Sequence, residues 1–125
     1  SFYINNPLPY LIIQHSGKSA DKTILCLSRQ HPGESVGSFV LEAFLDEVVK
    51  KEKLFEQFKL VVVPMINPDG VIYGNFRTNL AGFDLNRQWN EPNRWLHPEI
   101  FFLSKLISSF KIYSSAWISM VIQKK

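Results

Sequence analysis

The chain has 125 residues, of which 46% are apolar and 14% aromatic, enough for one domain with a modest hydrophobic core, and this composition excludes a disordered tail. Lysine and arginine total 14 against 11 acidic residues, a scattered balance that does not require an acidic partner. We expect no nucleic-acid binding, because the aromatic residues fall on predicted helix faces and do not alternate with basic ones. We also expect no membrane association, because no apolar run approaches the roughly 20 residues of a membrane span.

The single cysteine, Cys26, lies inside an apolar run and is predicted to be a small buried side chain, not half of a disulfide. A free buried thiol is typical of a reducing compartment. The sequence therefore favours a cytoplasmic location.

Two short apolar runs, Tyr10–Gln14 and Thr23–Leu27, predict neighbouring strands joined by a turn-rich segment. The second run does not alternate with polar residues, so we expect it to be buried on both faces. A third run, Lys59–Val63, is rich in β-branched residues and predicts another interior strand.

Between the last two strands the spacing predicts an amphipathic helix of about four turns that ends near Lys53. Its predicted apolar face consists of Val36, Phe39, Val40, Ala43, Phe44 and Val48. A strand, a helix and a strand within about forty residues form a βαβ unit, which predicts parallel strands.

Residues 65–92 show no convincing periodicity, and Asn67–Gly70 has the composition of a tight turn. His97 and Pro98 then open a second predicted helix. Its broad apolar face consists of Ile100, Phe101, Leu103, Leu106, Ile107 and Phe110. Ile112–Ile122 is strand-like, and the whole chain is interpreted as one α/β unit over residues 1–125.

His31 and Glu34 stand three residues apart where a predicted strand passes into a helix. Histidine and glutamate suit catalytic zinc, and open α/β sheets hold ligands beyond the carboxyl ends of their strands. Taken alone the pair is a weak signal, and a turn histidine beside a carboxylate that favours a helix N-terminus explains it better.

The segment after the third strand carries two arginines, an amide and a carboxylate: Arg77, Asp84, Asn86 and Arg87. Arginine side chains match carboxylates and developing oxyanions. These residues also fit an ordinary solvated loop when each is considered separately.

Taken in order, these motifs resemble those of the zinc metallocarboxypeptidases over roughly residues 8–110. The matching strings are His31–Glu34, Val63–Val71, Gly74–Arg77, Gly82–Trp89, Glu91–Arg94 and Leu96–Glu99. The chain is most similar to the cytosolic carboxypeptidase branch, which trims glutamates from tubulin and other protein tails. The resemblance implies a three-layer α/β/α sandwich with a mixed, centrally parallel sheet.

The resemblance also assigns roles to residues of this chain. His31 and Glu34 match two zinc ligands, and Arg77 matches the residue that stabilises the oxyanion. Asn86 and Arg87 match the pair that grips the terminal carboxylate of the substrate.

Asp84 matches a carboxylate that holds the outer nitrogen of the ligand histidine. The implied cofactor is one zinc ion, and the implied partners are protein or peptide C-terminal tails, tubulin among them.

The third zinc ligand and the general base of the family have no match in this chain. Ile112–Lys125 contains no histidine, and His15 and His97 stand in contexts that do not fit. The chain therefore resembles the N-terminal half of a catalytic domain. Two interpretations follow: part of a carboxypeptidase, or an inactive remnant that binds carboxylate-terminated tails or a protein partner.

Overall fold

A computed structural model describes residues 6–17, 20–110 and 117–119 of the chain. The elements in chain order are β1 (Leu11–Ile13), β2 (Lys22–Leu27), α1 (Val36–Val48), the 3-10 helix η1 (Glu52–Glu56), β3 (Phe58–Val63), α2 (Pro68–Ile72), the 3-10 helix η2 (Leu85–Arg87), α3 (Pro98–Ser108) and β4 (Trp117–Ser119). Among the described residues, no helix combines the length and the apolar character needed to cross a membrane.

The strands form one mixed sheet in the order β1-β3-β2-β4. β2 and β3 are parallel, with Leu27 opposite Val63, which confirms the predicted βαβ unit. β1 pairs with β3 in antiparallel orientation, and β4 pairs with β2 in parallel orientation.

The prediction that the first two strands are neighbours was therefore wrong, because β3 lies between them. Val61, Val62 and Val63 of β3 are fully buried, and the central place in the sheet buries this β-branched run better than an edge place would.

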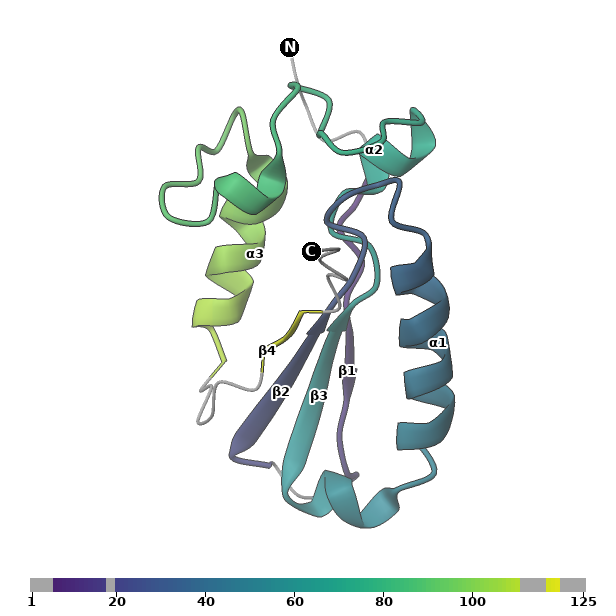
Figure 1. The fold of residues 1–125 in the computed structure, drawn as a ribbon. Helices are drawn as coiled ribbons and strands as arrows, with labels where there is room; N and C mark the ends of the chain where they lie inside the picture. Colours follow the sequence, from purple (N-terminus) through teal and green to yellow (C-terminus); the bar gives the residue numbers. More distant parts are fainter. Residues whose placement is uncertain (1–5, 18–19, 111–116, 120–125) are drawn as a thin grey trace.

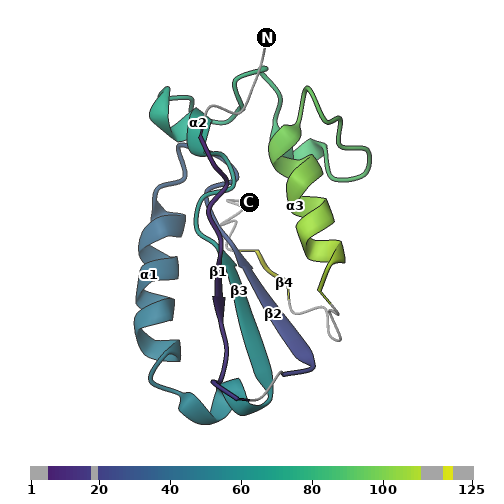
Figure 2. The same ribbon diagram turned by 180° about the vertical axis from the view of Figure 1, so that it is seen from behind.

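Helices cover both faces of the sheet, α1 on one side and α3 on the other (Figures 1 and 2). Alternate residues of β3 face the two layers. Val61 and Val63 share a core cluster with Leu103 of α3, whereas Val62 shares one with Leu41 of α1. Burial on both faces explains why the apolar runs of β2 and β3 do not alternate, and it confirms an α/β arrangement with a small mixed sheet.

Helix α1 buries only part of the predicted face: Val48 is buried and Phe44 packs against the same cluster. Leu41 and Val48 pack against the sheet, while Val36, Phe39 and Val40 are exposed. The helix is apolar on two sides, so spacing alone included exposed residues and missed Leu41. It also ends at Val48, earlier than the predicted end near Lys53, and the separate 3-10 helix η1 begins at Glu52.

Residues 65–92 contain more regular structure than the sequence predicted. Asn67–Gly70 is not a tight turn but the start of α2, with Pro68 in the first turn. The Asn67 side chain accepts a hydrogen bond from the Gly70 N–H at 2.9 Å, which caps the helix. The predicted strand Ile112–Ile122 is described only over β4, and its other residues lie outside the described residues.

Candidate functional site

The carboxyl ends of the parallel strands β2 and β3 continue as a hydrogen-bonded pair beyond the strands themselves. Ser28 N–H donates to the Val63 carbonyl at 3.0 Å, and Ile66 N–H donates to the Ser28 carbonyl at 2.9 Å. The chain then turns at His31, which is only 2% exposed. The candidate site thus lies where open α/β sheets hold their ligands.

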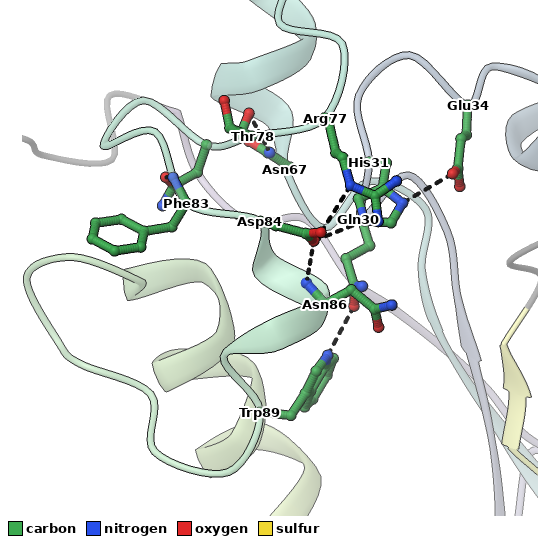
Figure 3. A network of polar contacts seen from close by, with 11 residues as sticks. Gln30, His31, Glu34, Asn67, Arg77, Thr78, Phe83, Asp84, Asn86 and Trp89 are labelled. Carbon is green, nitrogen blue, oxygen red and sulfur yellow. Dashed lines mark hydrogen bonds and ion pairs between the residues drawn. The ribbon is translucent and has the colours of Figure 1, made fainter.

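The two ring nitrogens of His31 face two different carboxylates (Figure 3). Nδ1 lies 2.9 Å from Oε1 of Glu34, and Nε2 lies 2.9 Å from Oδ1 of Asp84. The structure thereby brings together three of the residues that the sequence singled out. The imidazole ring is held from both sides, which fixes its orientation.

Asp84 connects the corner to the loop that carries the arginines. Its Oδ1 also accepts a hydrogen bond from the Asn86 backbone N–H at 2.9 Å, and its Oδ2 accepts one from Arg77 Nε at 2.8 Å. Burial by itself raises the pKa of Asp84, but the hydrogen bonds from His31, Arg77 and Asn86 outweigh it, so that the pKa lies below its ordinary value. Asp84 is therefore held in its charged form.

Arg77 stands in a loop that amide side chains fix in place. Asn67 and Asn75 both donate to the Thr78 carbonyl, at 3.2 and 3.1 Å. The Arg77 side chain is 46% exposed. Since only Nε contacts Asp84, the terminal nitrogens of this guanidinium are free of described partners and can reach a ligand.

Asn86 and Arg87 lie in η2, directly after Asp84. The Asn86 backbone N–H donates to Asp84 Oδ1. The side chains of Asn86 and Arg87 form no hydrogen bond to a described residue. Arg87 is exposed. The structure thus brings Asn86 beside His31 and Asp84 and leaves the Arg87 side chain without a contact to them.

The donor atoms of His31 and Glu34 suit a zinc ion. Ligands at about 2.0 to 2.2 Å from a tetrahedral metal lie roughly 3.3 to 3.6 Å apart, so the 2.9 Å between Nδ1 and Oε1 must widen by about half an ångström to admit the metal. Among the described residues, however, no group of three or more His, Cys, Asp or Glu side chains is placed to hold a metal. The corner therefore offers two donor atoms of the kinds that zinc binds, one nitrogen and one oxygen.

His15 and His97 do not join this corner. His97 precedes α3 and is 6% exposed, with Nδ1 accepting a hydrogen bond from the Asn93 N–H at 3.1 Å. Burial lowers its pKa, and its ring packs edge-on against Phe83. His15 is exposed. A hollow of about 400 Å³ beside α3 is lined by Pro92, Phe101, Ser104, Lys105 and Ser108 and contains none of the predicted site residues.

Several polar residues that support the site were not found from the sequence. Trp89 Nε1 donates to Oε1 of the buried Gln30 at 2.9 Å, and Asn79 binds four groups of the loop and of α3. Only the capping role of Asn67 had a local signal, because asparagine followed by proline is typical of a helix start. The others bind partners that are distant in sequence.

Comparisons with known proteins identify the family of this chain. Residues 3–106 match the family model described as zinc carboxypeptidase. Cytosolic carboxypeptidase 6 of Mus musculus is 40% identical over 106 residues, which cover 82% of this chain and 19% of that protein. Cytosolic carboxypeptidase 1 of Xenopus laevis is 44% identical over 88 residues, or 67% of this chain and 7% of that protein.

A similar solved structure is the metallo-carboxypeptidase of Pseudomonas aeruginosa in complex with (2-guanidinoethylmercapto)succinic acid. It has a TM-score of 0.75 and 30% identity, and the match covers 82% of this chain and 28% of that one. This chain thus spans about a fifth or less of the length of these two cytosolic carboxypeptidases and less than a third of the length of the Pseudomonas aeruginosa chain. Because the family model covers most of the sequence and the motifs meet at one corner, the chain belongs to the zinc carboxypeptidase family.

Proposed function

We propose that this chain carries part of the active site of a zinc-dependent metallocarboxypeptidase. The proposed reaction removes C-terminal residues, glutamate in the first place, from cytoplasmic protein tails such as those of tubulin. The observation that carries the proposal is the contact of His31 Nδ1 with Glu34 Oε1 at 2.9 Å, with Asp84 on the opposite ring nitrogen. Similarity to proteins named cytosolic carboxypeptidases supports the substrate class and the location.

In this proposal His31 and Glu34 hold the metal, and Asp84 fixes the imidazole so that Nδ1 points toward it. Bound zinc supplies a Lewis acid that polarises the scissile carbonyl and activates water. A third ligand and a general base have no candidate among the described residues, so the complete reaction needs groups beyond those identified here.

Arg77 is proposed to stabilise the negative charge that develops on the carbonyl oxygen. Its Nε is already bound to Asp84 at 2.8 Å, which orients the guanidinium and leaves its terminal nitrogens for the substrate. Asn86 and Arg87 are proposed to bind the terminal carboxylate. Arginine suits this role because its planar guanidinium forms paired hydrogen bonds to a carboxylate.

A second candidate function is tail binding without catalysis. It is favoured by the absence of a three-ligand group among the described residues, since two ligands bind zinc far more weakly than a full catalytic site. In this alternative Asn86 and Arg87 keep their role, whereas His31 and Glu34 do not bind a metal.

The first test is the zinc content of the purified 125-residue chain, with His31→Ala as the matched variant. Stoichiometric zinc that the variant loses supports the enzyme and justifies an assay on glutamate-terminated peptides. Zinc at the same low level in both proteins contradicts the metal site in this chain and favours the tail-binding alternative.

A second test separates recognition of the chain end from metal binding. A glutamate-terminated peptide and its C-terminal amide are titrated into the wild-type chain, Arg87→Ala and, as a control, Arg94→Ala. We expect the free carboxylate to bind at least tenfold more tightly than the amide, and only Arg87→Ala to abolish the difference. Equal binding of both peptides to the wild-type chain would exclude Arg87 as a carboxylate site.

A further inference from the structure

Arg29 has a backbone conformation that arginine rarely adopts. Its φ is +53°, and it is the only residue other than glycine with a positive φ in the described part of the chain. An L-residue with a Cβ is disfavoured in this region, and such conformations persist where surrounding contacts impose them. The strained residue lies two positions before His31.

The Arg29 side chain is committed to the corner that carries the candidate ligands. Nε and Nη2 both donate to the carbonyl oxygen of Pro32, at 3.1 and 2.7 Å. Nη1 donates to Oγ of Ser38 in the first turns of α1, at 2.9 Å. No ion pair joins this guanidinium to a described carboxylate. Its hydrogen bonds are made to the backbone carbonyl of Pro32 and to the Ser38 side chain of α1.

The peptide group between Pro32 and Gly33 is thereby held at both ends. Arg29 donates to the Pro32 carbonyl oxygen of this peptide group. The Gly33 N–H of the same peptide group donates to the Phe76 carbonyl at 2.8 Å. A Cβ on Gly33 would lie 2.5 Å from the Phe76 ring, so this close approach requires glycine.

This peptide group stands between the two candidate zinc ligands. Its rotation changes the direction of Glu34 relative to His31, and the same contact fixes Phe76, the residue before Arg77. We propose that Arg29 is a positioning residue that locks the Pro32–Gly33 peptide and so keeps His31 and Glu34 directed at one metal ion. The inference rests on the proposed function for the metal, but the lock itself can be measured without it.

Three substitutions separate the side-chain contacts from the backbone strain. Arg29→Met removes every donor and keeps the strain, Arg29→Gly removes the donors and relieves the strain, and Arg29→Lys keeps the charge with one donor group in place of the fork. Arg94→Ala is the control, since Arg94 lies on an exposed loop beside Trp95.

Two quantities are measured for each protein: the hydrogen-exchange rate of the Gly33 amide without metal, and the zinc affinity by competition with a chelator. We expect Arg29→Met and Arg29→Gly to exchange the Gly33 amide at least tenfold faster and to bind zinc at least tenfold more weakly. Arg29→Lys should lie between these variants and the wild type. The midpoint temperature of thermal unfolding, measured without metal, should be higher for Arg29→Gly than for Arg29→Met, because glycine relieves the backbone strain.

The proposal is overturned if a folded Arg29→Met or Arg29→Gly exchanges the Gly33 amide at the wild-type rate. It is also overturned if exchange becomes faster while the zinc affinity stays unchanged. If both variants unfold, a folded Arg29→Lys indistinguishable from the wild type overturns it. Unfolding of all three variants also overturns it, because Arg29 would then support the whole fold and not this corner. A wild-type chain that takes up no zinc refutes the proposed function, while the exchange rates still decide the lock.

Discussion

Asp84 holds His31 by the ring nitrogen that faces away from Glu34. Asp84 Oδ1 lies 2.9 Å from His31 Nε2, and Glu34 Oε1 lies 2.9 Å from Nδ1 on the other side of the ring. A carboxylate on the outer nitrogen leaves the inner nitrogen to a metal and raises its basicity. The same Asp84 also binds Arg77, so one side chain couples the candidate metal ligand to the candidate oxyanion group.

Asp84→Asn is expected to weaken zinc binding by about 10- to 100-fold, the usual effect of losing a carboxylate behind a ligand histidine. The amide oxygen can still accept a hydrogen bond from His31 but lacks the negative charge. Zinc affinity from chelator competition measures the effect. Asp46→Asn is the control because Asp46 is an exposed residue of α1. Equal affinities of the two variants would show that Asp84 does not act through His31.

Asp84 should also shape the stability of the chain in acid. The pKa of Asp84 is lowered from its ordinary value of 3.8, so its contribution to stability is present above that value and is lost as the pH falls through the folded-state pKa. The wild-type free energy of unfolding should therefore decrease on acidification below about pH 4, and Asp84→Asn should show a smaller decrease. Urea unfolding at a series of pH values tests this, and parallel curves would contradict it.

The sequence predicted the parts of the fold that depend on local composition. The β-branched run of β3 and the apolar run of β2 identify interior strands, and their separation by a helix identifies their parallel pairing. The position of β1 could not be predicted, because any apolar strand can pair with either neighbour and the choice depends on the whole sheet. The buried face of α1 was predicted only in part for a related reason, since Leu41 and Phe39 are equally apolar and lie on different sides of the helix.

The candidate site was predicted where its residues form a recognisable order along the chain. The contact between His31 and Asp84 spans 53 positions and was expected only because the motifs resemble a known family. Arg29 and Asn79 gave no such signal. Most of their hydrogen bonds are to backbone carbonyls and N–H groups, which every part of a chain supplies, so these partners cannot be identified from residue types.

Glu99→Gln is expected to stabilise the chain at neutral pH. Glu99 is 3% exposed, and burial raises its pKa against the opposing hydrogen bonds from its own backbone and from Asn79, with the charge of Asp69 raising it further. A raised carboxyl pKa means that stability is lost as the pH rises from 4.5 through the folded-state pKa. Glutamine stays neutral and can still accept the hydrogen bond from Asn79.

The measurement is the free energy of unfolding of Glu99→Gln and wild type at pH 7 and at pH values below about 4. The difference should favour the variant at pH 7 and vanish in acid. Glu42→Gln, on the exposed side of α1, is the control. A variant less stable than wild type at pH 7 would mean that the charged carboxylate is needed where it lies.

Asn79→Ala is expected to destabilise the chain by about 2 to 4 kcal/mol, because it leaves one buried and three partly buried polar groups without this partner. Asn79 is 2% exposed, its Oδ1 accepts from the N–H groups of Ala81 and Phe83, and its Nδ2 donates to the Leu96 carbonyl and to Glu99. These bonds hold the loop that leads to Asp84. Urea unfolding compares this variant with Asn90→Ala, which changes an exposed residue of the same type. A loss no larger than that of Asn90→Ala would mean that the contacts of Asp84 alone hold the loop.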